Sequence, residues 1–207
     1  MPNKKNKLII GLVTLGILVF GVTLFFVIQS NGKVEQYKAE QLEATTHDIN
    51  YVLPYKNEYM GNNSNTVNLF YHLPLTTSDM KFELFPDTLT VQIDYSNTLL
   101  HVGKESMSHK QYAASGLADE LNTIYKNEVE KSIIYNSTAA FALIDNLEYI
   151  VYHFSDVSYK VSRTDIKALY SNFDTILNET NWKDNVQSKL KEKSYIADVA
   201  SRVLIQQ

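Results

Sequence analysis

The chain has 207 residues, the length of one ordinary domain with short additional segments, and its 44% hydrophobic and 20% charged residues exclude a disordered protein. It contains no cysteine, which excludes disulfides, thiolate metal sites and cysteine nucleophiles. Three of its 19 basic residues lie before residue 8, leaving 16 basic against 23 acidic residues, a net charge of −7 that argues against nucleic acid as a partner.

Residues 8–28 are uncharged and apolar, and they predict a transmembrane helix. At about 1.5 Å per residue this helix is roughly 31 Å long, the thickness of the hydrocarbon core of a bilayer. A cleaved signal peptide is the alternative interpretation. Because the bulky residues 25–28 stand where signal peptidase requires small ones, an uncleaved anchor is favoured.

The lysines at positions 4, 5 and 7 predict the orientation of this anchor, because positive charge is retained on the cytoplasmic side. Residues 1–7 are therefore expected to form a cytoplasmic tail of a single-pass cell-membrane protein, with everything after the anchor outside the cell. Residues 29–50 are polar and rich in Lys, Glu and Gln, and they predict a helical stalk or linker. We expect an extracytoplasmic domain over residues 51–174 and a C-terminal helix over 175–207.

A short helix is predicted after the turn-forming cluster Gly61, Asn62, Asn63 and Ser64, with Ser64 near its N-cap. Two extended runs follow between residues 81 and 95 and are separated by a Pro-Asp pair. In the second run apolar and polar residues alternate from position 88 to position 95. This pattern predicts a β-hairpin with one solvated face.

The next region changes to helical periodicity. Ser108–Gln111 has the form of a capping box, and the apolar residues between 117 and 129 predict a long amphipathic helix. Asn136–Thr138 is a candidate interruption before a buried helix over residues 139–144.

Two further strands and two further helices are predicted in the last third of the chain. Leu147–Phe154 is apolar on both faces, which is typical of a central strand, and Val157–Val161 is expected to pair with it. Ser162–Asp165 has the form of a second capping box and predicts a helix start. A final helix is expected from Trp182 to Leu204. The fold class is thus α+β, with a small antiparallel sheet packed against several helices.

Five short motifs occur in the order Tyr59–Ser64, Leu73–Pro74, Leu89–Tyr95, Phe141–Leu147 and Tyr159–Asp165. In this order and spacing the chain resembles domain of unknown function family 4825 over about residues 53–173. The resemblance implies a bacterial, mostly Gram-positive, exported or membrane-anchored protein. It supplies no catalytic residue that could be transferred to this sequence.

The sequence contains no recognisable catalytic, cofactor or metal set. The five histidines form no zinc-binding pair, although His101, His109 and Glu105 flank one loop where they are an alternative metal site. The pair Glu128 and Glu130 is interpreted as part of a solvated helix face, and His153 as a hydrogen-bonded structural residue.

The one candidate binding loop is Gly61, Asn62, Asn63 and Ser64, which could hold an anion at a helix N-terminus or serve only as a turn and helix cap. We expect a non-catalytic binding, accessory or sensing domain without a cofactor, whose ligand is a protein, a peptide or an envelope component. An envelope hydrolase with an unfamiliar site and a structural spacer remain the alternatives.

Overall fold

The computed structural model describes residues 30, 32–95, 117–155 and 157–207, and for residues 117–125 it describes the backbone alone. The chain divides between Glu40 and Gln41 into two units. In the first unit, residues 32–40 are helical. The predicted transmembrane segment 8–28 lies outside the described residues, and within them no helix is long and apolar enough to cross a bilayer.

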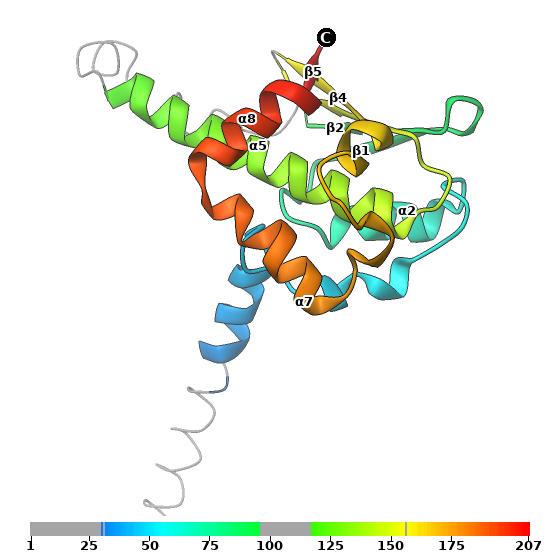
Figure 1. Cartoon of the computed structure of the whole chain (residues 1–207), viewed down its shortest axis with the longest axis horizontal. Coiled ribbons are helices and arrows are strands. Elements are labelled where there is room, and N and C mark those ends of the chain that lie inside the picture. Colours follow the sequence, from blue (N-terminus) through cyan, green and yellow to red (C-terminus); the bar gives the residue numbers. More distant parts are fainter. Residues whose placement is uncertain (1–29, 31, 96–116, 156) are drawn as a thin grey trace, which may run out of the picture. The chain divides into compact units, whose positions relative to one another are not determined.

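The second unit is built around a five-stranded sheet with the order β1-β2-β3-β4-β5 (Figure 1). Its strands are β1 (Lys81–Phe85), β2 (Thr90–Asp94), β3 (Tyr149–His153), β4 (Ser158–Ser162) and β5 (Ile205–Gln206). The predicted hairpin is confirmed, since β1 and β2 are antiparallel and are separated by the 3-10 turn η3 (Pro86–Thr88). The predicted pairing of β3 with β4 is also confirmed.

The prediction of a purely antiparallel sheet is wrong, because β2 and β3 run parallel. A parallel neighbour requires a crossover connection, and this chain makes it through helix α5 (Leu117–Leu143). The alternation of apolar and polar residues indicates which face of a strand is buried but not the direction of its neighbour. The sheet is therefore mixed.

One face of the sheet carries the core and the other is solvated. Val91, Ile93, Ile150, Tyr152 and Val161 are buried on the core face. The prediction of a central strand is confirmed, since β3 is the middle strand of the sheet. Its second face is not buried, however, since Tyr149 and His153 at its two ends are exposed.

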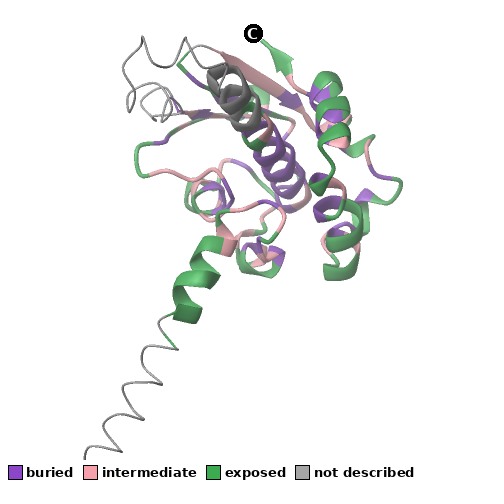
Figure 2. Ribbon diagram, turned by 90° about the vertical axis from the view of Figure 1, so that its left-hand side faces the viewer, coloured by how far each residue is buried: buried purple, intermediate pink, exposed green. Residues whose placement is uncertain are grey.

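Helix α5 is the central element of the core (Figure 2), and every residue from Val129 to Phe141 is buried. The predicted interruption at Asn136–Thr138 does not occur, and each of the three polar side chains forms a hydrogen bond inside the core, although the side-chain oxygen of Asn136 is buried without a partner among the described residues. Asn136 donates to the carbonyl of Pro74 at 2.5 Å, Ser137 lies 3.1 Å from the Tyr152 hydroxyl, and Thr138 donates to a carbonyl one turn earlier. The capping box predicted at Ser108–Gln111 lies outside the described residues.

The segment before the sheet contributes the 3-10 turns η1 (Ile49–Tyr51) and η2 (Leu53–Tyr55) and the helix α2 (Asn63–Tyr71). The sequence placed residues 29–50 in a linker, whereas Ala44, His47 and Ile49 are buried core residues. Isolated apolar residues in a polar stretch show no periodicity, so the pattern did not indicate that this stretch joins the core.

The C-terminal part is not the single helix that was predicted. After α6 (Arg163–Lys167) come η4 (Phe173–Thr175), α7 (Glu179–Trp182), the π-helical turn η5 (Lys183–Gln187), the 3-10 turn η6 (Lys189–Lys191) and α8 (Lys193–Val203). Because the helix restarts at Lys193, the apolar face shifts by one residue, so Ile196 is buried and Ala197 is exposed.

Candidate functional site

The predicted binding loop lies at the start of α2 as a helix cap. The N-cap residue is Asn62, whereas the predicted cap Ser64 lies within the first turn of the helix. The side-chain oxygen of Asn62 accepts from the backbone N–H of Asn65 at 3.5 Å. Asn62, Asn63 and Ser64 are exposed, whereas Gly61 is half-buried. A Cβ atom on Gly61 would lie 2.3 Å from a ring carbon of Tyr59, which explains why a glycine suits this close approach.

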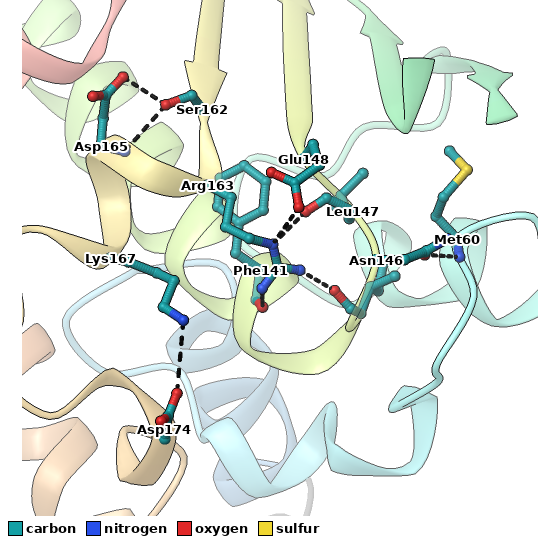
Figure 3. A network of polar contacts seen from close by, with 11 residues as sticks. Met60, Phe141, Asn146, Leu147, Glu148, Ser162, Arg163, Asp165, Lys167 and Asp174 are labelled. Carbon is teal, nitrogen blue, oxygen red and sulfur yellow. Dashed lines mark hydrogen bonds and ion pairs between the residues drawn. The ribbon is translucent and has the colours of Figure 1, made fainter. Parts of the chain in front are cut away.

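The same loop is tied to the core by Met60, which is buried. The backbone N–H of Met60 donates to the side-chain oxygen of Asn146 at 2.7 Å (Figure 3), and the Thr66 hydroxyl donates to the Met60 carbonyl at 2.9 Å. These bonds anchor to the core the turn that precedes α2.

Arg163, which follows β4, is a structural residue that the sequence pattern did not single out. Figure 3 shows its guanidinium reaching the C-terminal end of α5, where it donates to the carbonyls of Phe141 at 2.8 Å and Leu147 at 2.6 Å, and also to that of Ile144. Burial lowers the pKa of Arg163, while Glu148 at 3.7 Å and Asp145 oppose that change. The arginine thus satisfies carbonyls that the helix end leaves without partners. The neighbouring Ser162 caps α6 as predicted.

A second buried polar network joins three distant segments around Tyr135. His47 places Nε2 at 2.8 Å from the His72 carbonyl, which can only accept, so Nδ1 accepts from the Tyr135 hydroxyl at 2.8 Å. The indole N–H of Trp182 donates to the same hydroxyl at 3.1 Å. Burial lowers the pKa of His47, despite opposing effects of the His72 carbonyl and Asp48. A neutral His47 with both ring nitrogens paired is a structural group.

The other histidines form no metal site in the part of the chain that the structure describes. His153 lies at the end of β3, and its Nδ1 is 2.6 Å from the Ser158 hydroxyl. His101, His109 and Glu105 lie outside the described residues. Within those residues, no three His, Asp or Glu side chains are grouped so that they could hold a metal ion.

The strongest candidate site is an open pocket of about 220 Å³ beside α5, which we call the Lys131 pocket. One side comes from α5, with Asn127, Glu128 and Lys131, and Thr45 lies beside them. The opposite side comes from the segment around η6 and α8 and is formed by Leu190, Lys191, Lys193 and Ile196. None of these residues belongs to the predicted binding loop.

Lys131 is the anchor of this pocket, with 7% of its surface exposed. Its ammonium group forms ion pairs with Glu43 at 2.7 Å and with Glu128. Desolvation alone would lower the pKa of Lys131, but the bonds to Glu128 and Glu43 outweigh it and raise that pKa above its ordinary value. Desolvation would likewise raise the pKa of Glu43, yet Lys131 and Thr45 lower it. The pair therefore favours its charged form.

The prediction that Glu128 and Glu130 share a solvated face is wrong for Glu130. Glu128 is exposed, but Glu130 is only 8% exposed and pairs with Lys126 at 3.6 Å. Burial raises the pKa of Glu130, and Lys126 partly offsets that change. Two helix positions that differ by two residues face different sides, and the sequence alone did not indicate which side packs.

The Lys131 pocket could not be found from the sequence, because its residues lie in three separate stretches of the chain. Lys131 and Glu128 are three residues apart on one helix, a spacing typical of a surface ion pair. Thr45 lies in the predicted linker, and Lys191 lies in the predicted C-terminal helix. Only the packed fold brings these segments together.

The model of one protein family matches residues 52–164, more than half of the chain. The chain belongs to the family described as "Domain of unknown function (DUF4825)". The DUF4825 region includes the α5 side of the Lys131 pocket, whereas Thr45 and the residues from Leu190 to Ile196 flank it. Neither a curated protein nor a solved structure matches the chain. The pocket thus combines the DUF4825 domain with both of its flanking segments.

Proposed function

We propose that this protein is a single-pass bacterial membrane protein whose extracytoplasmic domain binds a ligand in the Lys131 pocket, as a binding, accessory or sensing subunit. The apolar segment 8–28 and the lysines before it support the anchor and its orientation. The observation that carries the binding role is the pocket itself, with a buried charged residue held in place beside an open volume of about 220 Å³.

The charges around the pocket favour binding over catalysis. A general acid or base works best when its pKa lies near the operating pH. The ion pair moves the pKa of Lys131 upward and that of Glu43 downward, away from neutrality in both cases. These two groups keep fixed charges, which suits recognition of a ligand.

The pocket also favours a binding domain over a structural spacer. A spacer needs a rigid body but no cavity. Here the apolar residues Leu190 and Ile196 line the pocket together with charged residues. Apolar lining residues with a few charged groups are the usual composition of a small-molecule site.

The experiment uses the full chain in detergent micelles and a panel of small metabolites and cell-envelope fragments. The variant Asn127→Trp fills the pocket from α5 without changing a charge, and Asn68→Trp places the same side chain on the exposed side of α2 as a control. The proposal predicts a compound that raises the melting temperature of the natural protein and of Asn68→Trp but not of Asn127→Trp, and that is recovered unchanged.

Two results would contradict the proposal. If the natural protein converts a compound of the panel and Asn127→Trp does not, the domain is an envelope hydrolase. If no compound distinguishes the natural protein from Asn127→Trp, the pocket has no ligand in the panel and the structural spacer becomes the better account.

A further inference from the structure

We propose that the Lys131 pocket takes a small zwitterion, a free α-amino acid with an apolar side chain. This inference rests on the proposed binding function and names the ligand class of the same site. It follows from the opposite charges on the two sides of the pocket, from the apolar residues that line it and from its small volume.

The α5 side of the pocket carries an excess of negative charge. Glu128 lies on the α5 side, where it shares the single ammonium group of Lys131 with Glu43. Two carboxylates and one ammonium leave this side with one negative charge in excess. A positively charged group of a ligand would complete that pairing.

The opposite side of the pocket carries positive charge. Lys191 and Lys193 both line it and are exposed, and neither forms an ion pair with another described residue. An exposed ammonium group beside an open pocket can bind a carboxylate of the ligand. The two sides therefore match a molecule that carries both signs.

A ligand with charge of one sign only does not match both sides of the pocket. A small dianion would meet the excess carboxylate charge of Glu128 and Glu43, and a simple cation would meet Lys191 and Lys193. Either ligand leaves one side of the pocket unpaired, and like charges at close distance are repulsive. A zwitterion is the ligand that satisfies both sides at once.

The apolar residues and the volume define the rest of the ligand. Leu190 and Ile196 line the pocket on the same side as the two lysines and offer an apolar contact for a side chain. The volume of about 220 Å³ lies below the roughly 300–1,000 Å³ typical of sites for drug-sized molecules. The pocket thus suits a single amino acid.

The test uses the full chain in detergent micelles and measures the affinity for alanine, valine, leucine and phenylalanine by calorimetry. For each amino acid that binds, two analogues are compared, one without the amino group and one without the carboxyl group. Because a charge-assisted hydrogen bond contributes about 1.5–3 kcal/mol, each analogue is expected to bind at least about tenfold more weakly.

Matched variants assign the two charges to the two sides. The double variant Lys191→Gln and Lys193→Gln is expected to have an at least about tenfold lower affinity for the amino acid. Its affinity for the analogue without a carboxyl group is expected to equal that of the natural protein. Glu128→Gln is expected to have a lower affinity for the amino acid and an unchanged affinity for the analogue without an amino group. The control double variant Lys56→Gln and Lys81→Gln removes the same charge from two exposed sites outside the pocket and leaves the affinity unchanged.

The inference is overturned if no amino acid binds more tightly to the natural protein than to Asn127→Trp, or if an analogue with one charge binds as tightly as the zwitterion. A different panel compound that still distinguishes the natural protein from Asn127→Trp would leave the binding function standing and reject only this ligand class.

Discussion

At the scale of single residues, burial and ion pairing have opposite effects on the charge of Lys131. Their balance determines the pH range in which Lys131 stabilises the fold. Burial opposes its charge, and the ion pairs with Glu43 and Glu128 restore it. The folded-state pKa of Glu43 lies below its ordinary value of 4.5, and that of Lys131 lies above 10.5. The stabilisation is therefore complete between about pH 4.5 and pH 10.5. It is lost as the pH falls through the folded-state pKa of Glu43 or rises through that of Lys131.

The variant Lys131→Met tests this balance. At pH 7 we expect it to lower the free energy of unfolding by about 1–2 kcal/mol, a small value because water screens the half-exposed carboxylates. The difference from the natural protein should shrink below pH 4.5, where Glu43 becomes protonated. Urea unfolding can be followed by the fluorescence of the single, buried Trp182.

A matched control is Lys81→Met, which replaces an exposed lysine on β1. It should leave the free energy of unfolding unchanged at every pH. A constant difference between Lys131→Met and the natural protein from pH 3 to pH 8 would refute the role of the Glu43 carboxylate.

At the scale of secondary-structure elements, Arg163 connects the end of α5 to the start of α6. Its guanidinium donates to three backbone carbonyls at the end of α5 and just after it. Arg163, which follows β4, therefore acts as a C-terminal cap of α5. We expect Arg163→Met, which keeps an apolar chain but removes the donors, to lower the free energy of unfolding by about 3 kcal/mol.

The comparison variant for this element is Arg202→Met. Arg202 pairs with Asp198 one turn away on the exposed face of α8, so its loss should change the free energy of unfolding by less than about 0.5 kcal/mol. Equal effects of the two substitutions in the same urea experiment would show that the carbonyls at the end of α5 do not depend on Arg163.

The elements that the sequence predicted correctly are those with strong local signals. The alternation in β2, the cap at Ser162 and the long helix α5 all follow from spacing within a few residues. The parallel pairing of β2 with β3 depends on contacts between residues far apart in the chain. The broken C-terminal helix kept the spacing of Trp182, Val186 and Leu190, so its apolar pattern did not reveal the break.

The candidate site illustrates the same limit. The sequence pattern pointed to Gly61–Ser64, because a glycine beside two asparagines and a serine is typical of a helix start that can bind an anion. The Lys131 pocket carries no such local signal. Its charged residues look like ordinary surface ion pairs until the segments at residues 45, 127–131 and 190–196 are packed together.

At the scale of the whole molecule, we propose that the segment at residues 8–28 remains in the membrane with its lysine-rich side in the cytoplasm. A ligand pocket on the outer domain would then sample small molecules outside the cell. Since the natural chain has no cysteine, a single introduced thiol reports its own location without background labelling.

The most direct measurement is therefore thiol labelling of the full chain in intact cells with a membrane-impermeant maleimide. The variant Asn68→Cys carries its thiol on the exposed side of α2, and Asn3→Cys carries it before the apolar segment. We predict that the thiol at position 68 reacts in intact cells and that the thiol at position 3 reacts only after lysis. Labelling of position 3 but not position 68 in intact cells, or recovery of position 68 in the medium on a chain that lacks residues 8–28, would contradict the account.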